Sequence, residues 1–147
     1  MLTTRLTARF GMTVPVVSAG MAMVAGPALA AAVTNAGGLG VLGGAIAPPE
    51  GLAALAAATR ALTARPFGID VITPFVEDTH IAALVACRPA VVVFFWGTPR
   101  VEHLRRLRAA GIDVWVQVGR VAEAREAAAA GVDAIIAQGS EAGGHNR

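Results

Sequence analysis

A glycine-rich segment that ends in a histidine is the part of this sequence best suited to chemistry. It reads Gln138-Gly139-Ser140-Glu141-Ala142-Gly143-Gly144-His145. A histidine can accept or donate a proton near neutral pH, and glycines allow the backbone to approach a ligand closely. The segment directly follows an apolar run, residues 133–137, and a buried strand that leads into such a loop often places a base at the rim of an α/β sheet. His145 is therefore the candidate catalytic residue.

The composition indicates a single folded domain without a strong overall charge. The chain has 147 residues, of which 55% are hydrophobic and 15% charged. That is too apolar for a disordered chain and long enough for one core. The formal net charge is +2, so no strong field would attract nucleic acid. All 12 basic residues are arginines, which excludes Schiff-base chemistry by lysine and a P-loop lysine.

The spacing of cysteine and histidine predicts neither a disulfide framework nor a metal site. Cys87 is the only cysteine, and His80 and His103 lack partners at ligand spacing. Residues 10–49 carry no charge and resemble a secretory signal, but prolines and glycines interrupt them. The sequence contains no uninterrupted run of about 20 apolar residues, the length that a helix needs to span a membrane. We therefore expect a cytoplasmic protein with no metal and no membrane partner.

Strand-like and helix-like runs alternate along the chain. The expected strands are residues 14–18, 38–42, 66–71, 90–95, 113–117 and 133–137. The expected helices are residues 27–35, 48–63, 77–86, 98–110 and 121–130. Most of the strand-like runs are continuously apolar and rich in β-branched residues, as in parallel strands that are covered on both faces. The pattern predicts an α/β fold built from repeated strand–helix units.

A short internal repeat supports this architecture. The segment Ala109–Asp113 recurs as Ala129–Asp133, and each copy ends a helix on a glycine and enters a strand. Right-handed crossovers would place the helices on one side of a growing parallel sheet. Six strands and five helices predict a (β/α)8 TIM barrel that is incomplete here, with about six βα units in one partial domain, residues 1–147. A doubly wound sheet is the alternative, but no G-x-G-x-x-G segment opens a helix.

Three segments together resemble a known enzyme family. They are Pro15–Met21, Gly26–Gly43 and Gln138–His145. Their order and spacing resemble those of the FMN-dependent nitronate monooxygenases, formerly called 2-nitropropane dioxygenases, over nearly the whole chain. The flavin-dependent enoyl-acyl-carrier-protein reductases share much of the pattern. The resemblance implies a TIM-barrel flavin-binding domain, of which this chain holds the N-terminal part.

The resemblance also implies an activity and a set of contacts. Enzymes of this family oxidise alkyl nitronates with molecular oxygen, and they bind FMN non-covalently at the C-terminal mouth of the barrel. Matched by position, Met21 would offer a backbone contact to the flavin ring, and Gln138 would offer a hydrogen bond. Gly143 and Gly144 would offer backbone amides, and His145 would be the active-site histidine.

Two features depart from the family pattern. Asp70 stands where the family usually has an asparagine that touches the flavin, and a carboxylate there would repel a reduced, anionic flavin. The glycine-rich turns after the seventh and eighth strands, which hold most of the FMN phosphate in the family, have no counterpart in this sequence.

Two other interpretations stay open. One is a flavin-dependent reductase that takes electrons from NAD(P)H and acts on an enoyl thioester or a quinone. The other is an inactive, truncated fragment. An unclosed sheet would leave strand edges and apolar surface without partners, so self-association is expected of such a chain.

Overall fold

Five parallel strands form one sheet whose order follows the chain. The computed structural model describes residues 2–145. The strands are β1 (Val41–Gly43), β2 (Gly68–Ile72), β3 (Val91–Phe95), β4 (Asp113–Val118) and β5 (Ala134–Ala137). Each strand pairs with the next one in parallel. A doubly wound sheet reverses its strand order at one point, so this sequential order excludes that alternative and confirms the predicted TIM-barrel fold, of which the chain covers a part.

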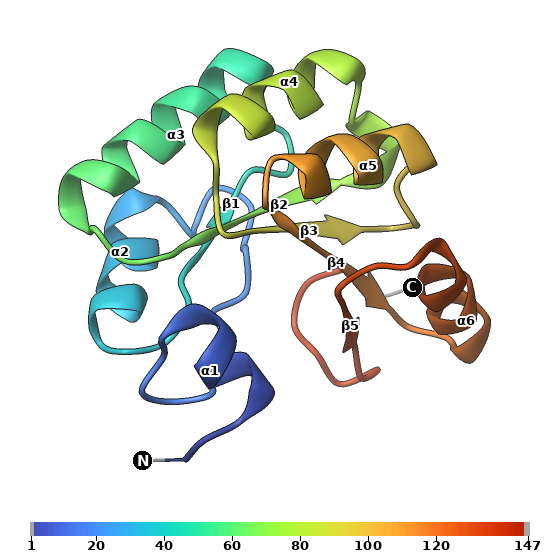
Figure 1. Ribbon diagram of the computed structural model, residues 1–147, viewed down its shortest axis with the longest axis horizontal. Helices are drawn as coiled ribbons and strands as arrows, with labels where there is room; N and C mark the ends of the chain where they lie inside the picture. The colour runs from blue at the N-terminus through green and yellow to red at the C-terminus, as the bar shows by residue number, and fades with distance from the viewer. Residues whose placement is uncertain (1, 146–147) are drawn as a thin grey trace.

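Five helices return the chain between the strands. They are α2 (Pro27–Asn35), α3 (Pro49–Leu62), α4 (Asp78–Cys87), α5 (Val101–Ala109) and α6 (Val121–Ala130). Prolines occupy the first turn of α2 and α3, where backbone amides have no partner within the helix and the missing amide of proline costs no hydrogen bond. Gly131 ends α6 with a φ of 78°, a left-handed conformation that glycine adopts without strain. These helices lie along the outer face of the sheet (Figure 1).

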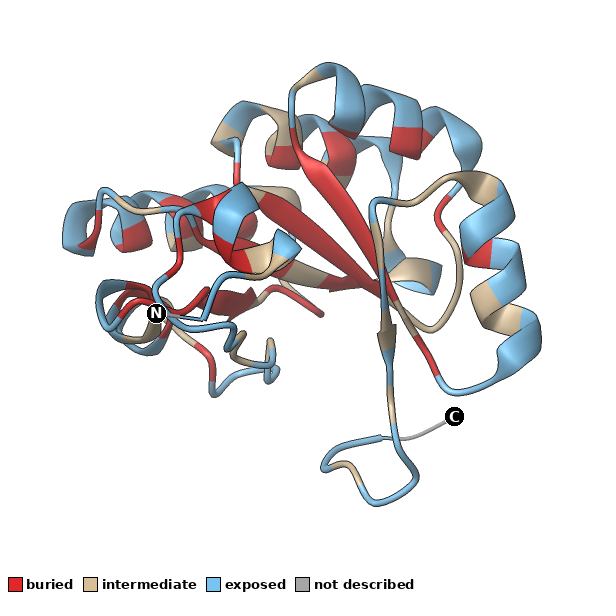
Figure 2. Cartoon of the chain, turned by 60° about the horizontal axis from the view of Figure 1, so that its bottom comes forward, coloured by how far each residue is buried: buried red, intermediate tan, exposed pale blue. Residues whose placement is uncertain are grey.

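Successive strand residues point to opposite faces and build two apolar cores. Ile69, Phe94 and Val116 belong to the larger core, which lies between the sheet and the helices. Val93 and Trp115 belong to the smaller core on the opposite, inner face. Figure 2 shows the strands buried at the centre and the helices exposed on their outer sides. The continuous apolar runs of the sequence therefore reflect strands that are buried on both faces.

A short helix that the sequence pattern did not predict covers the inner face. In α1 (Arg5–Phe10), the ring of Phe10 meets Trp115 edge to face at 5.7 Å between centroids. The guanidinium group of Arg9 donates two hydrogen bonds to the buried carboxylate of Asp113, the first residue of β4. The helix thus closes the inner face at the N-terminal ends of the strands.

The prediction of a first strand at residues 14–18 is wrong. Only one parallel bridge forms there, between Val17 and Leu39. Pro15 has no amide to donate to a neighbouring strand. Beyond the bridge, the amide of Val41 in β1 donates to the side-chain oxygen of Ser18 at 3.0 Å rather than to a backbone carbonyl. The pairing therefore stops after one bridge, and the sheet has five strands rather than six.

The far edge of the sheet is open in the part of the chain that the structure describes. Within residues 2–145, β5 pairs with β4 alone, and Ile135 is 39% exposed. Self-association through this edge stays a prediction. Among the same residues, none of the helices has the length and apolar character needed to cross a membrane.

The packing of α1 gives a test of what holds the inner face closed. Phe10→Ala should lower the free energy of unfolding by about 3 kcal/mol, because it removes a buried ring and leaves a cavity beside Trp115. Urea unfolding followed by tryptophan fluorescence measures this. Phe75→Ala is the matched control, since Phe75 is 56% exposed and its loss should cost about 0.5 kcal/mol or less. Similar losses in both variants would show that α1 does not seal the sheet.

Candidate functional site

The residues expected to act together fall into two groups at the C-terminal ends of the strands. The Asp70 group consists of Gly20, Met21, Gly44 and Asp70, beside the ends of β1 and β2. The His145 group consists of Trp96, Gln117, Gln138 and His145, beside the ends of β3, β4 and β5. Barrel enzymes gather their ligand contacts at this end of the strands.

Asp70 lies on the inner side of β2 and is held by backbone. The amide of Gly44 donates to its Oδ1 at 2.8 Å. A Cβ at Gly20 would overlap the carboxyl group of Asp70, so glycine is required at that position for the two segments to approach. The carboxyl group is therefore half-buried between the strand that carries it and the loop before α2.

Burial changes the protonation of this carboxyl group. Loss of solvent raises the pKa of Asp70 to about 7, against the opposing effect of the Gly44 amide. No charged side chain is among the causes of the shift. Near neutral pH, a large fraction of Asp70 is thus uncharged and can donate a hydrogen bond as an asparagine amide does. The repulsion expected from a carboxylate at this position is correspondingly reduced.

Met21 lies in a tight turn beside the end of β1. Its carbonyl accepts the amides of Val24 and Ala25 at 3.0 and 2.8 Å. A Cβ at Gly43 would overlap the same carbonyl, and the Met21 side chain is 43% exposed. The turn is thus packed against the strand end, and the contact of Met21 with a flavin ring stays a prediction.

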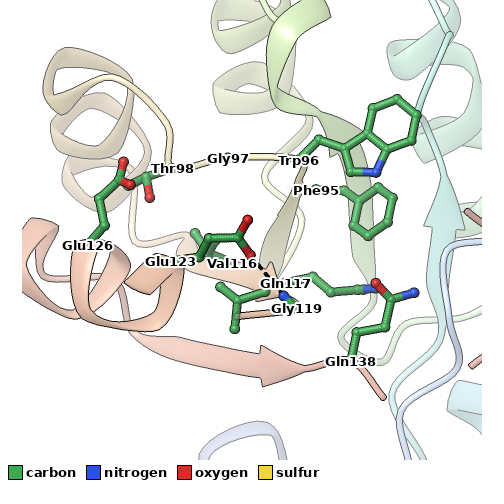
Figure 3. Close-up of a pocket in the computed structure, with 11 residues that line it drawn as sticks. Phe95, Trp96, Gly97, Thr98, Val116, Gln117, Gly119, Glu123, Glu126 and Gln138 are labelled. Atoms are coloured by element: carbon green, nitrogen blue, oxygen red, sulfur yellow. Dashed lines mark hydrogen bonds between the residues drawn. The ribbon is translucent and has the colours of Figure 1, made fainter. Parts of the chain in front are cut away.

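A small pocket of about 40 Å³ lies at the ends of β3, β4 and β5. Phe95, Trp96, Gln117 and Gln138 are among the residues that line it, and Figure 3 shows Phe95, Trp96 and Gln138 on the same side of the strand ends. The amide of Gln138 donates to the carbonyl of Val118 at 2.9 Å, which continues the pairing of β5 with β4 by one residue. This bond fixes the backbone from which the Gln138 side chain enters the pocket.

His145, in the loop after β5, contacts Trp96, one of the residues that line this pocket. Its imidazole meets the indole of Trp96 edge to face, at 6.1 Å between ring centroids and 84° between planes. Gly143 and Gly144 precede it and are exposed, and Gly144 has a φ of 85°. The predicted catalytic residue thus lies at the C-terminal end of the strands, and its partner there is an aromatic ring.

Two features of this rim were missed or misjudged from the sequence. Gln117 is the one polar side chain on the inner side of the C-terminal half of β4, and the alternation in Val114–Val118 could have indicated it. The Nε1 atom of Trp96 is buried without an acceptor among residues 2–145, which the sequence alone does not indicate. A larger pocket of about 380 Å³ lies between the loops after β1 and β2, and its lining is apolar apart from His80.

The two groups suit the ring of a flavin better than its phosphate. They supply the two carboxamides of Gln117 and Gln138 and a carboxyl group, that of Asp70, which is partly uncharged near neutral pH. Neutral donors and acceptors of this kind match the heteroatoms of an isoalloxazine ring. Neither group contains an arginine among the residues described. The described residues also hold no cluster of three or more potential metal ligands.

Comparison with known proteins points to one family. The chain is 38% identical to a 5-hydroxy-7a-methyl-1-oxo-octahydro-1H-indene-4-carboxyl-CoA dehydrogenase of Rhodococcus jostii, over 98% of this chain and 41% of that protein. It is 36% identical to a nitronate monooxygenase of Paraburkholderia phytofirmans, over 92% and 48%. The solved structure of FabK from Thermotoga maritima superposes with a TM-score of 0.90 at 35% identity, over 99% and 47%. The chain thus spans about half the length of these relatives.

The family model for nitronate monooxygenase matches residues 3–79 and 73–147, which together cover nearly the whole chain. The matched region includes both groups at the rim. The chain therefore belongs to the nitronate monooxygenase family.

Proposed function

We propose that this chain forms the N-terminal part of an FMN-dependent oxidoreductase that oxidises alkyl nitronates or nitroalkanes with molecular oxygen. The observation that carries the proposal is the position of His145, at the C-terminal end of the parallel strands and against the Trp96 ring. Family membership and the nitronate monooxygenase among the relatives support it. The small-molecule partners would be the nitronate and oxygen.

Different residues at the rim would bind the flavin and transfer the proton. Met21, Asp70 and Gln138 would contact the ring of FMN, and the backbone amides of Gly143 and Gly144 would contact it from the loop. FMN, when bound, takes electrons from the substrate and delivers them to oxygen. The imidazole of His145 removes the proton from the carbon next to the nitro group, so that a neutral nitroalkane becomes the nitronate.

A reductase is the second candidate function. A CoA dehydrogenase and FabK are among the relatives, at identities similar to that of the nitronate monooxygenase. Such an enzyme would take electrons from NAD(P)H and pass them to an enoyl thioester or a quinone. Anaerobic stopped-flow mixing with NAD(P)H separates the two functions, because rapid bleaching of the flavin supports the reductase. A purified chain that takes up no FMN would support an inactive fragment.

His145→Asn tests the role of the imidazole. Turnover of a neutral nitroalkane should fall at least about 100-fold, because the variant lacks the base. Turnover of the pre-formed nitronate should fall much less, since its proton is already gone. Oxygen consumption with each substrate measures both rates. An equal loss on the two substrates would contradict a role in proton removal.

Asp70→Asn tests whether the uncharged carboxyl group binds the flavin. Affinity of the wild type for FMN should fall about tenfold between about pH 6 and about pH 8, because the group ionises around its pKa of about 7. The asparagine stays neutral, so the affinity of the variant should be flat over this range. Titration of FMN fluorescence at each pH measures the dissociation constant.

A second measurement needs no flavin. In the folded chain Asp70 keeps its proton up to about pH 7, whereas in the unfolded chain it releases the proton above about pH 4. The free energy of unfolding of the wild type should therefore fall as the pH rises from about 4 to about 7. Asp70→Asn should lack this fall. Asp78→Asn is the control, since hydrogen bonding to His103 and the charge of Arg100 lower the pKa of Asp78. It should keep the wild-type profiles. Identical profiles for the wild type and Asp70→Asn would contradict the assignment.

A further inference from the structure

Trp96 carries a buried hydrogen-bond donor for which residues 2–145 supply no acceptor. Its Nε1 atom has almost no contact with solvent and no acceptor among residues 2–145. An indole N–H can only donate, and buried donors in native proteins nearly always have a partner. The unpaired N–H therefore indicates that a group other than residues 2–145 supplies the acceptor.

The backbone at Trp96 is held in an uncommon conformation. Its φ of 65° lies in the left-handed region, which bulky residues seldom adopt. The next residue, Gly97, has a φ of 133°, and its carbonyl accepts the hydroxyl of Thr73 at 2.9 Å. This bond ties the turn after β3 to the end of β2. Strain of this kind persists where the surroundings enforce it and is frequent at ligand sites.

The turn brings the indole against the candidate base. Residues of a strand alternate between faces, and Trp96 follows the inward-facing Phe95, so a regular strand would turn the indole toward the helices. The left-handed conformation instead stacks it on Phe95, at 5.3 Å between ring centroids and 30° between planes. From there its ring contacts His145. The unused donor and the imidazole thus belong to the same corner of the rim.

We propose that the indole N–H of Trp96 binds an oxygen atom of the substrate head group beside His145. This inference rests on the proposed function. The part of the substrate that the site recognises is a planar group with oxygen acceptors, such as a nitro group, a nitronate or a carboxylate. Held through one oxygen by Trp96, the substrate presents the neighbouring carbon to the imidazole. Trp96 is therefore a substrate-binding residue, and a purely apolar compound would leave its donor unpaired.

Isobutyrate is a suitable probe, because it has nearly the shape of the nitronate of 2-nitropropane and is not oxidised. The FMN-loaded chain, labelled with ¹⁵N, gives one indole N–H resonance for Trp96 and one for Trp115, which Trp115→Phe distinguishes. Isobutyrate should move the Trp96 resonance downfield in a saturable way and leave that of Trp115 in place. Trp96→Phe keeps a ring against Phe95 and His145 and removes the donor.

The variant should bind isobutyrate about tenfold more weakly, the effect of one lost hydrogen bond to a charged group, and should keep the wild-type affinity for FMN. The visible spectrum of the flavin reports isobutyrate binding independently of the indole. Binding with an unmoved Trp96 resonance and an unaffected variant would overturn this inference and leave the proposed function in place. A Trp96 shift that FMN alone saturates would assign the acceptor to the flavin and overturn the substrate contact. A chain that binds no FMN would overturn both proposals.

Discussion

Parallel pairing in chain order is the constraint on which the rest of this structure depends. Because each strand pairs with the next, the C-terminal ends of all five lie along one rim. The register also fixes which side chains face inward, since a slip of one residue would turn every one of them outward. Asp70 and Gln138 are far apart in the sequence, yet this pairing places both at the same rim.

The same parallel pairing places the contacts that stabilise the fold and the candidate site residues at opposite ends of the strands. At the N-terminal ends, α1 covers the inner face with the Phe10 ring and pairs Arg9 with the buried carboxylate of Asp113. At the C-terminal ends, the inner face carries carboxamides and opens into loops with glycines. Barrel enzymes show this division generally. It allows loops at the rim to differ between relatives with different reactions while the packed end keeps the fold.

The sequence was sufficient where local pattern decides the structure. Four of the strands, β2 to β5, begin and end within about two residues of the apolar runs that predicted them, and the helices between them begin and end within about three residues of their predicted ranges. The segment at residues 14–18 was misjudged because a side chain, that of Ser18, takes the amide that a longer ladder needs. The helix α1 was missed because it is six residues long and is stabilised by a distant partner, Trp115.

The site was harder to predict because its properties arise from contacts between distant segments. Asp70 reads as an ordinary carboxylate in the sequence, and its raised pKa follows only from burial against Gly20 and Gly44. Trp96 reads as a residue that packs the rim, and only its left-handed backbone directs the indole toward His145. In both cases the residue type was visible, and the environment that changes its chemistry was not.

The separation of the two groups limits what can bind at this rim. Asp70 lies on β2 and Gln138 follows β5, three strand spacings away, or about 14 Å along the curved sheet. A single small substrate cannot contact both groups at once. A flat ligand with several fused rings can lie between them, with the uncharged carboxyl group at one end and the carboxamides at the other. The corner beside His145, where the indole N–H of Trp96 has no partner among residues 2–145, lies at the carboxamide end of this span.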